Sequence, residues 1–131
     1  MSNISHIIAT RELCRQIMDD NGIDLVVYDA VYPNKKRPDE FLVVKSIVHS
    51  DDGRPISQGA VEVCIYVANL KYGDDQSQPN LWLINDLTGI FMSGIKGASK
   101  NGVVFNDFRT MLVKDNDIRY FYQSIVIDVV S

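Results

Sequence analysis

The side chains that could act as nucleophiles or proton carriers are two histidines and two cysteines: His6, His49, Cys14 and Cys64. Nucleophilic catalysis needs a base within hydrogen-bond reach of the nucleophile. No Ser or Cys in a nucleophile motif accompanies either histidine. Cys14 falls in a helical pattern and Cys64 in a strand pattern, which favours small buried thiols over a disulfide or a Cys–His pair. We therefore predict no catalytic residues and no turnover.

Acidic residues cluster at Asp19-Asp20, Asp51-Asp52, Asp74-Asp75 and Asp115-Asn116-Asp117. Only the last cluster is similar to the start of a calcium loop. Arg119 then occupies the fifth position, and the required Gly and spaced Glu are absent. All four clusters fall where turns or helix ends are expected, so we interpret them as solvated turns. The sequence predicts no metal site.

Glycines at Gly94, Gly97 and Gly102 lie between a predicted helix and a predicted strand. A dinucleotide site needs the reverse order, strand to helix, so that phosphate meets the helix N-terminus. The chain has no P-loop pattern either. We predict no cofactor and no small-molecule substrate.

Tyrosine is the unusual residue type of the predicted strands. Tyr66, Tyr120 and Tyr122 point away from the apolar faces of their strands. Such tyrosines either pack under another part of the same chain or anchor an interface, because they bury much area with few rotors. Both interpretations stay open from sequence. The candidate subunit or partner interface consists of Tyr32, Lys35, Lys36, Arg37, Tyr66, Tyr72, Tyr120 and Tyr122.

Two helices are predicted from apolar residues at helical spacing, near residues 4–21 and 81–95. Asn80 is a plausible N-cap for the second helix. Gly89 and Gly94 weaken that helix, each by up to about 1 kcal/mol.

Strands are predicted at residues 25–28, 41–48, 59–70, 103–113 and 118–130. Val61, Val63, Ile65 and Val67 share one face of their strand, and Phe121, Ile125, Ile127 and Val129 share one face of the last. Residues 71–80 are predicted to form an exposed polar loop. We expect one α+β domain over residues 1–131, with the order α-β-β-β-α-β-β. Both helices would pack on one face of a single mainly antiparallel sheet.

Composition is close to that of globular domains, with 46% hydrophobic and 23% charged residues. No apolar run is long enough to cross a membrane. The first residues lack the pattern of a secretory signal, which predicts a cytosol-like compartment. The net charge of −4 opposes general nucleic-acid binding. The basic run Lys35-Lys36-Arg37 lies between prolines and before two acidic residues, so we interpret it as a solvated loop.

The order of elements is marked by Val31-Tyr32-Pro33, residues 41–44, residues 59–67 and the final strand pair. This order resembles that of the tail-terminator, or tail-completion, proteins of tailed bacteriophages, which join head and tail. The resemblance implies a non-enzymatic structural protein of a phage or prophage virion. Such proteins form a ring of subunits, commonly six, that caps the tail tube. The length of loop 71–80 and the glycine-broken second helix depart from the pattern and leave the exact neck or tail position open.

The resemblance also implies partners and a location. The partners would be further copies in a ring, possibly a hexamer, and other tail or head-connector proteins, with DNA only in passage through a channel. The location would be the virion, at the head–tail junction or tail, after assembly in the bacterial cytoplasm. No membrane is involved.

Two other classes remain as alternatives: a small ligand-binding domain and a regulatory protein-interaction domain of a bacterium. A ligand pocket would need inward polar groups, for which Glu62 or Lys45 could serve. Portal, capsid and tail genes beside the gene would favour the virion class.

Overall fold

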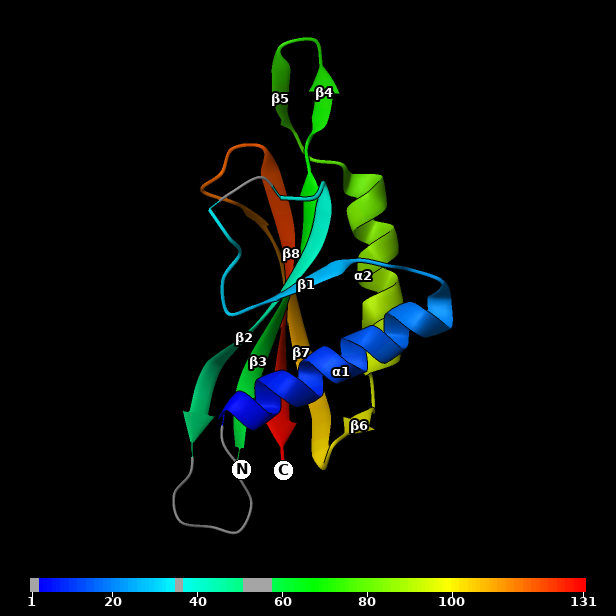
Figure 1. Cartoon of the computed structure of the whole chain (residues 1–131), viewed down its shortest axis with the longest axis vertical. Coiled ribbons are helices and arrows are strands. Elements are labelled where there is room, and N and C mark those ends of the chain that lie inside the picture. The colour runs from blue at the N-terminus through cyan, green and yellow to red at the C-terminus, as the bar shows by residue number, and fades with distance from the viewer. Residues whose placement is uncertain (1–2, 35–36, 51–57) are drawn as a thin grey trace.

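The computed structural model describes residues 3–34, 37–50 and 58–131. Two helices, α1 (Asn3–Asn21) and α2 (Leu81–Ile95), lie on one side of a six-stranded sheet (Figure 1). The strands of this sheet are β1 (Val26–Asp29), β2 (Glu40–Ser50), β3 (Gln58–Ala68), β6 (Ser99–Lys100), β7 (Val103–Lys114) and β8 (Tyr120–Val130). A separate two-stranded sheet is formed by β4 (Leu70–Tyr72) and β5 (Asp75–Gln78). The α+β class is confirmed.

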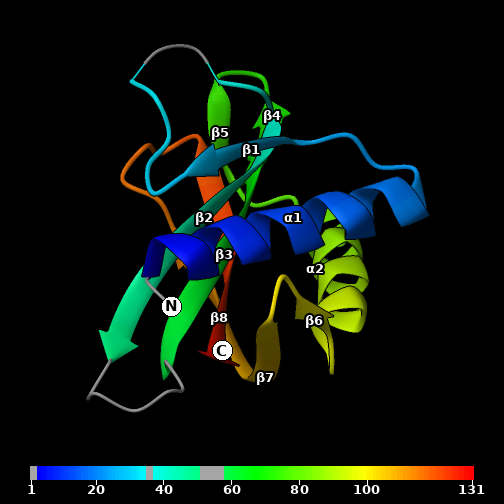
Figure 2. The same ribbon diagram turned by 60° about the horizontal axis from the view of Figure 1, so that its bottom comes forward.

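Both predicted helices are present within a residue of their expected bounds. Helix α1 lies across β2 and β3 (Figure 2). It is followed by Gly22, whose φ of 67° suits the end of a helix. Helix α2 begins as predicted, because the Asn80 side chain accepts a hydrogen bond from the Leu83 amide at 3.3 Å.

The main core lies between the helices and one face of the sheet. Helix α2 contributes Ile84, Leu87, Phe91 and Ile95, all buried. The sheet contributes the predicted faces of β3 and β8, including Ile65 and Ile127, which are both fully buried. Period-2 alternation therefore assigned the covered face of these two strands correctly, and both helices pack on that face.

The prediction of a single mainly antiparallel sheet is wrong in two respects, because the main sheet is mixed and β4 and β5 form a second sheet. The main sheet has the strand order β1-β2-β3-β8-β7-β6, and β1 pairs in parallel with β2. Parallel neighbours need a long crossover, which here is residues 30–39. The crossover starts at Ala30, with a φ of 68°, and brings Tyr32 against Phe41 and Tyr66. Its described residues therefore cover part of the sheet face opposite the helices.

Residues 71–80 also differ from the expected polar loop. They contain β5 and part of β4, which form an antiparallel hairpin. Backbone pairing holds the hairpin, and no apolar alternation signals it in the sequence. With β6 as a further short strand, the observed order is α-β-β-β-β-β-α-β-β-β.

Gly94 has a packing role that the sequence did not reveal. A Cβ atom at this position would lie 2.5 Å from Cγ1 of Ile17 on α1, which is buried and β-branched. The two helices can therefore approach this closely only because Gly94 has no side chain.

We expect Gly94→Ala to lower the free energy of unfolding by about 1–3 kcal/mol through overpacking. The matched control is Gly89→Ala in the same helix, where an added Cβ meets no atom within 4 Å. This control should raise the free energy of unfolding by about 0.5–1 kcal/mol. Denaturant unfolding of both variants measures the difference, and equal effects would contradict the close contact between α1 and α2.

Candidate functional site

Most of the predicted interface residues meet on the sheet face opposite the helices. Tyr66 lies between two stacked rings, with centroid distances of 4.7 Å to Phe41 and 4.6 Å to Tyr122. Tyr120 lies edge-on to Phe41 at 5.5 Å. Stacked and edge-to-face pairs stabilise a cluster beyond the area that they bury. These rings thus form a second hydrophobic core, which we call the aromatic core.

The crossover completes this core through Tyr32. The Tyr32 ring lies edge-on to Tyr66, with centroids 5.4 Å apart. Its hydroxyl donates a 2.7 Å hydrogen bond to Asp115 Oδ2 in the β7–β8 turn. Burial, together with this hydrogen bond, raises the pKa of the Tyr32 phenol to about 12. Tyr32 is therefore a neutral donor near neutral pH.

Arg37 ties the crossover to the same turn. Its guanidinium pairs with Asp117 and lies 4.2 Å from the ring centroid of Tyr32 and 5.3 Å from that of Tyr120. The Arg37 side chain is only 7% exposed, so the pair is largely desolvated. The interpretation of Asp115 and Asp117 as solvated turn residues is therefore wrong, since both bind the crossover.

The structure places the candidate interface residues differently from one another. Tyr66 and Tyr120 are each 5% exposed, so they pack within their own chain. Tyr32, Tyr122 and Arg37 are partly buried in the same cluster. Tyr72 alone is well exposed, at 61%, and lies on the β4–β5 hairpin. Lys35 and Lys36 lie outside the described residues.

The groups considered for chemistry lie in several parts of the fold, although Cys64, Glu62 and Lys45 are neighbours. Cys14 and Cys64 are free, buried thiols that belong to the main and the aromatic core, on opposite faces of the sheet. His6 is buried, with Nε2 3.1 Å from Ser131 Oγ. Glu62 pairs with Lys45 at 3.3 Å and accepts a hydrogen bond from Ser124. Within residues 3–34, 37–50 and 58–131, no three His, Cys, Asp or Glu side chains could hold a metal ion.

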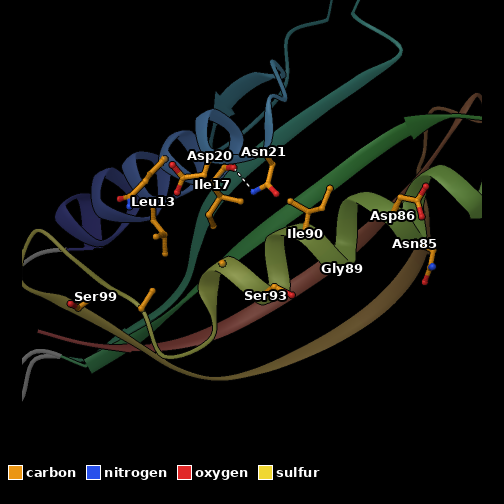
Figure 3. Close-up of a pocket in the computed structure, with 13 residues that line it drawn as sticks. Leu13, Ile17, Asp20, Asn21, Asn85, Asp86, Gly89, Ile90, Ser93 and Ser99 are labelled. Atoms are coloured by element: carbon orange, nitrogen blue, oxygen red, sulfur yellow. Dashed lines mark hydrogen bonds between the residues drawn. The ribbon is translucent and has the colours of Figure 1, made fainter.

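A groove of about 820 Å³ lies between the two helices (Figure 3). Polar side chains from both helices border it, among them Asp20 and Asn21 of α1 and Asp86 and Ser93 of α2. Neither Glu62 nor Lys45 is part of its lining. The groove offers space and hydrogen-bonding groups, without the inward polar residues that the sequence suggested for a ligand pocket.

The edge of the sheet at β7 is the most unusual surface feature. β6 pairs only with Val103 and Val104, and the Phe105 amide donates to the Ala98 carbonyl at 3.0 Å. β7 from Asn106 to Lys114 therefore has no outer neighbour among the described strands. Met111, 64% exposed, lies on the face of the aromatic core, and Leu112 lies on the helix face. An exposed edge with apolar flanks is a template for pairing with another strand.

A second groove adjoins this edge on the helix side. Its volume is about 680 Å³, and it is lined by Leu81, Trp82, Ile84, Asn85, Thr88, Met92, Thr110, Leu112 and Gln123. Trp82 is 84% exposed. The Thr88 hydroxyl is buried and has no hydrogen-bond partner in the described part of the chain. We call this the α2–β7 groove.

Sequence reasoning missed Trp82, Met111 and Leu112 as surface residues. One signal was available for the first: on the predicted helix 81–95, Trp82 lies opposite the stripe that contains Leu87 and Phe91. For the strand, adjacent apolar residues at Met111 and Leu112 must face opposite sides of the sheet. Sequence alone did not show that neither side is covered there.

Comparison with known proteins does not identify a family for this chain. No protein-family model matches the chain, and no curated protein matches it. Among the helices described here, none has both the length and the apolarity to cross a membrane.

The ion pairs of Asp117 predict an acid-sensitive stability. Arg119 donates to both of its oxygens, at 3.0 and 2.8 Å, and these hydrogen bonds hold the pKa of Asp117 at about 2, below its ordinary 3.8. A lowered native pKa stabilises the fold above the ordinary value. This contribution is lost as the pH falls from about 4 to about 2.

We expect Asp117→Asn to lower the free energy of unfolding at pH 7 by about 3 kcal/mol, because Arg37 keeps a buried charge without its partner. The deficit should shrink as the pH falls from 4 toward 2. Chemical denaturation at a series of pH values measures this deficit. Asp86→Asn, at an exposed position of α2, is a control with the same change of charge. A deficit independent of pH would contradict this account.

Proposed function

We propose that this chain is a non-enzymatic structural protein of a phage or prophage virion, of the tail-terminator or tail-completion kind. It forms a ring of subunits at the head–tail junction and binds neighbouring tail or head-connector proteins. The observation that supports this role best is the open edge of β7 from Phe108 to Lys114. Met111 and Leu112 of this edge expose apolar side chains on opposite faces of the sheet. The edge therefore gives each copy a surface suited to contact with another protein chain.

One other feature agrees with an assembly role. The net charge of −4 also suits a channel through which DNA passes without sticking to the wall.

The test is deletion of the gene from its phage or prophage, followed by imaging of the particles. We expect heads and tails that fail to join, and rescue by the wild-type gene supplied in trans. Normal, correctly joined and infectious virions without the gene would refute the proposal.

A ligand-binding or regulatory domain is the second candidate, and the groove between α1 and α2 favours it. Gly89→Trp separates the two functions, because Gly89 lines this groove and a side chain there meets no atom within 4 Å at its Cβ. If the chain is a virion subunit, this variant rescues particle assembly as well as wild type. A Gly89→Trp protein that folds but no longer rescues the deletion would instead support the ligand-binding role.

A further inference from the structure

A small pocket lies where the crossover, the base of the β4–β5 hairpin and the β7–β8 turn meet, at one end of the main sheet (Figure 1). Its volume is about 150 Å³. The lining includes Arg37 and Asp39 of the crossover, Lys71 and Gln76 of the hairpin, and Arg119 of the turn. Segments that are far apart in sequence therefore form one concave site.

Hydrogen bonds hold these segments together. The Tyr120 hydroxyl donates to the Pro38 carbonyl at 3.0 Å, which joins β8 to the crossover. The Asn69 amide nitrogen Nδ2 donates to the carbonyls of Gln76 at 3.0 Å and Ile118 at 3.1 Å, which joins the hairpin to the turn. The Gln76 side chain donates to the Asn69 carbonyl at 3.3 Å. The walls of the pocket are thus fixed before any ligand binds.

The cations of the pocket exceed its carboxylates. Its lining holds the cations Arg37, Lys71 and Arg119, and Asp39 is the single carboxylate among the lining residues. Asp117 pairs with both arginines, so the two guanidiniums share one carboxylate. With Asp117 included, three cations face two carboxylates, which leaves one positive charge in excess.

The other nearby acidic residues belong to a separate hollow. Asp74 and Asp75 line that hollow together with Lys114, and neither aspartate lines the pocket. The excess positive charge is therefore local to the pocket, in a chain whose net charge is −4. A concave site of one sign raises the local concentration of ligands of the opposite sign, here anions.

The lining also holds hydrogen-bond donors that lack acceptors. The Arg37 side chain is only 7% exposed, and its Nε–H is buried without a partner in the described part of the chain. Arg119 binds Asp117 through Nε and Nη2, which leaves Nη1 without a partner among the described residues, as is the Lys71 ammonium group. A buried donor without an acceptor costs free energy, and a bound anion would supply the acceptor.

The size of the pocket and its types of donor select the class of anion. Because a water molecule occupies roughly 30 Å³ in the liquid, the pocket holds about five atoms of that size. A phosphate group, in which oxygens surround one phosphorus atom, matches this size. Guanidinium groups bind phosphate oxygens in pairs, and a lysine adds a point charge.

We propose that this pocket binds a phosphate group. Lys71 and Arg119, whose side chains reach solvent, contact its oxygens at the mouth, and Arg37 donates from the wall. The phosphate is either the free inorganic ion or an ester at the end of a larger molecule. This site goes beyond the proposed virion role and does not depend on it, because none of its residues belongs to the β7 edge.

The test is titration of the purified chain with sodium phosphate at constant ionic strength, followed by ¹H–¹⁵N NMR. The Nε–H signal of Arg37, whose burial slows its exchange with water, should move and then level off. The side-chain amide signals of Gln76 should move with the same dissociation constant. Sodium acetate over the same range is the control and should leave these signals in place.

Variants of opposite sign check the charges. Lys71→Met, at an exposed position, should weaken phosphate binding about tenfold. Asp39→Asn removes the carboxylate from the lining and should tighten binding, which a merely structural effect would not produce. Lys96→Met is the matched control, because it removes the same charge from an exposed position outside the pocket. Unfolding curves establish that each variant folds.

Glycerol 3-phosphate, with glycerol as its control, distinguishes the two sources of the phosphate. If it moves the same signals, the pocket accepts an ester of a larger molecule. If only inorganic phosphate moves them, the ligand is the free ion.

Three results would overturn the proposal: signals that do not move with phosphate in the millimolar range, equal shifts with acetate and with phosphate, or equal binding of phosphate by Lys71→Met and Lys96→Met. Each of these results leaves the virion role standing, because deletion of the gene tests that role separately.

Discussion

The Arg37 guanidinium, between the rings of Tyr32 and Tyr120 and paired with Asp117, fixes the arrangement of one whole side of the molecule. The parallel pairing of β1 with β2 forces the chain to cross the sheet, and this contact holds the crossover down on Tyr66. One half of that face thereby becomes a second core. The crossover covers the β1–β2–β3 side of this face, whereas β7 beyond Phe105 has no outer neighbour among the described strands.

The parts of the fold that sequence predicted are those encoded locally. Helical spacing located α1 and α2, and alternation assigned the covered face of β3 and β8. The partner of a strand is not encoded locally, because alternation is the same for a parallel and an antiparallel neighbour. The β1–β2 pairing was therefore missed. The hairpin of residues 70–78 was missed because backbone bonds and the amides of Asn69 and Gln76 hold it, with no apolar pattern.

The candidate site was predicted only in part for a related reason. Tyr66, Tyr120 and Tyr122 were identified as unusual, and they do gather in one place with Tyr32, but the crossover turns them into packing residues. Whether a strand residue is covered depends on segments far away in sequence. Trp82, Met111 and Leu112 are residue types typical of a core, and they are exposed only because nothing in the described chain lies over them.

The two cysteines lie on opposite sides of the sheet, one in each core. Burial raises the pKa of the Cys14 thiol to about 12, and it also raises the pKa of Cys64. The thiolate, which is the nucleophile that attacks oxidants and disulfides, is therefore scarce at both positions. With the sheet between them, the sulfurs cannot join unless the chain unfolds. The folded chain therefore forms no disulfide between Cys14 and Cys64, in reducing or in oxidising surroundings.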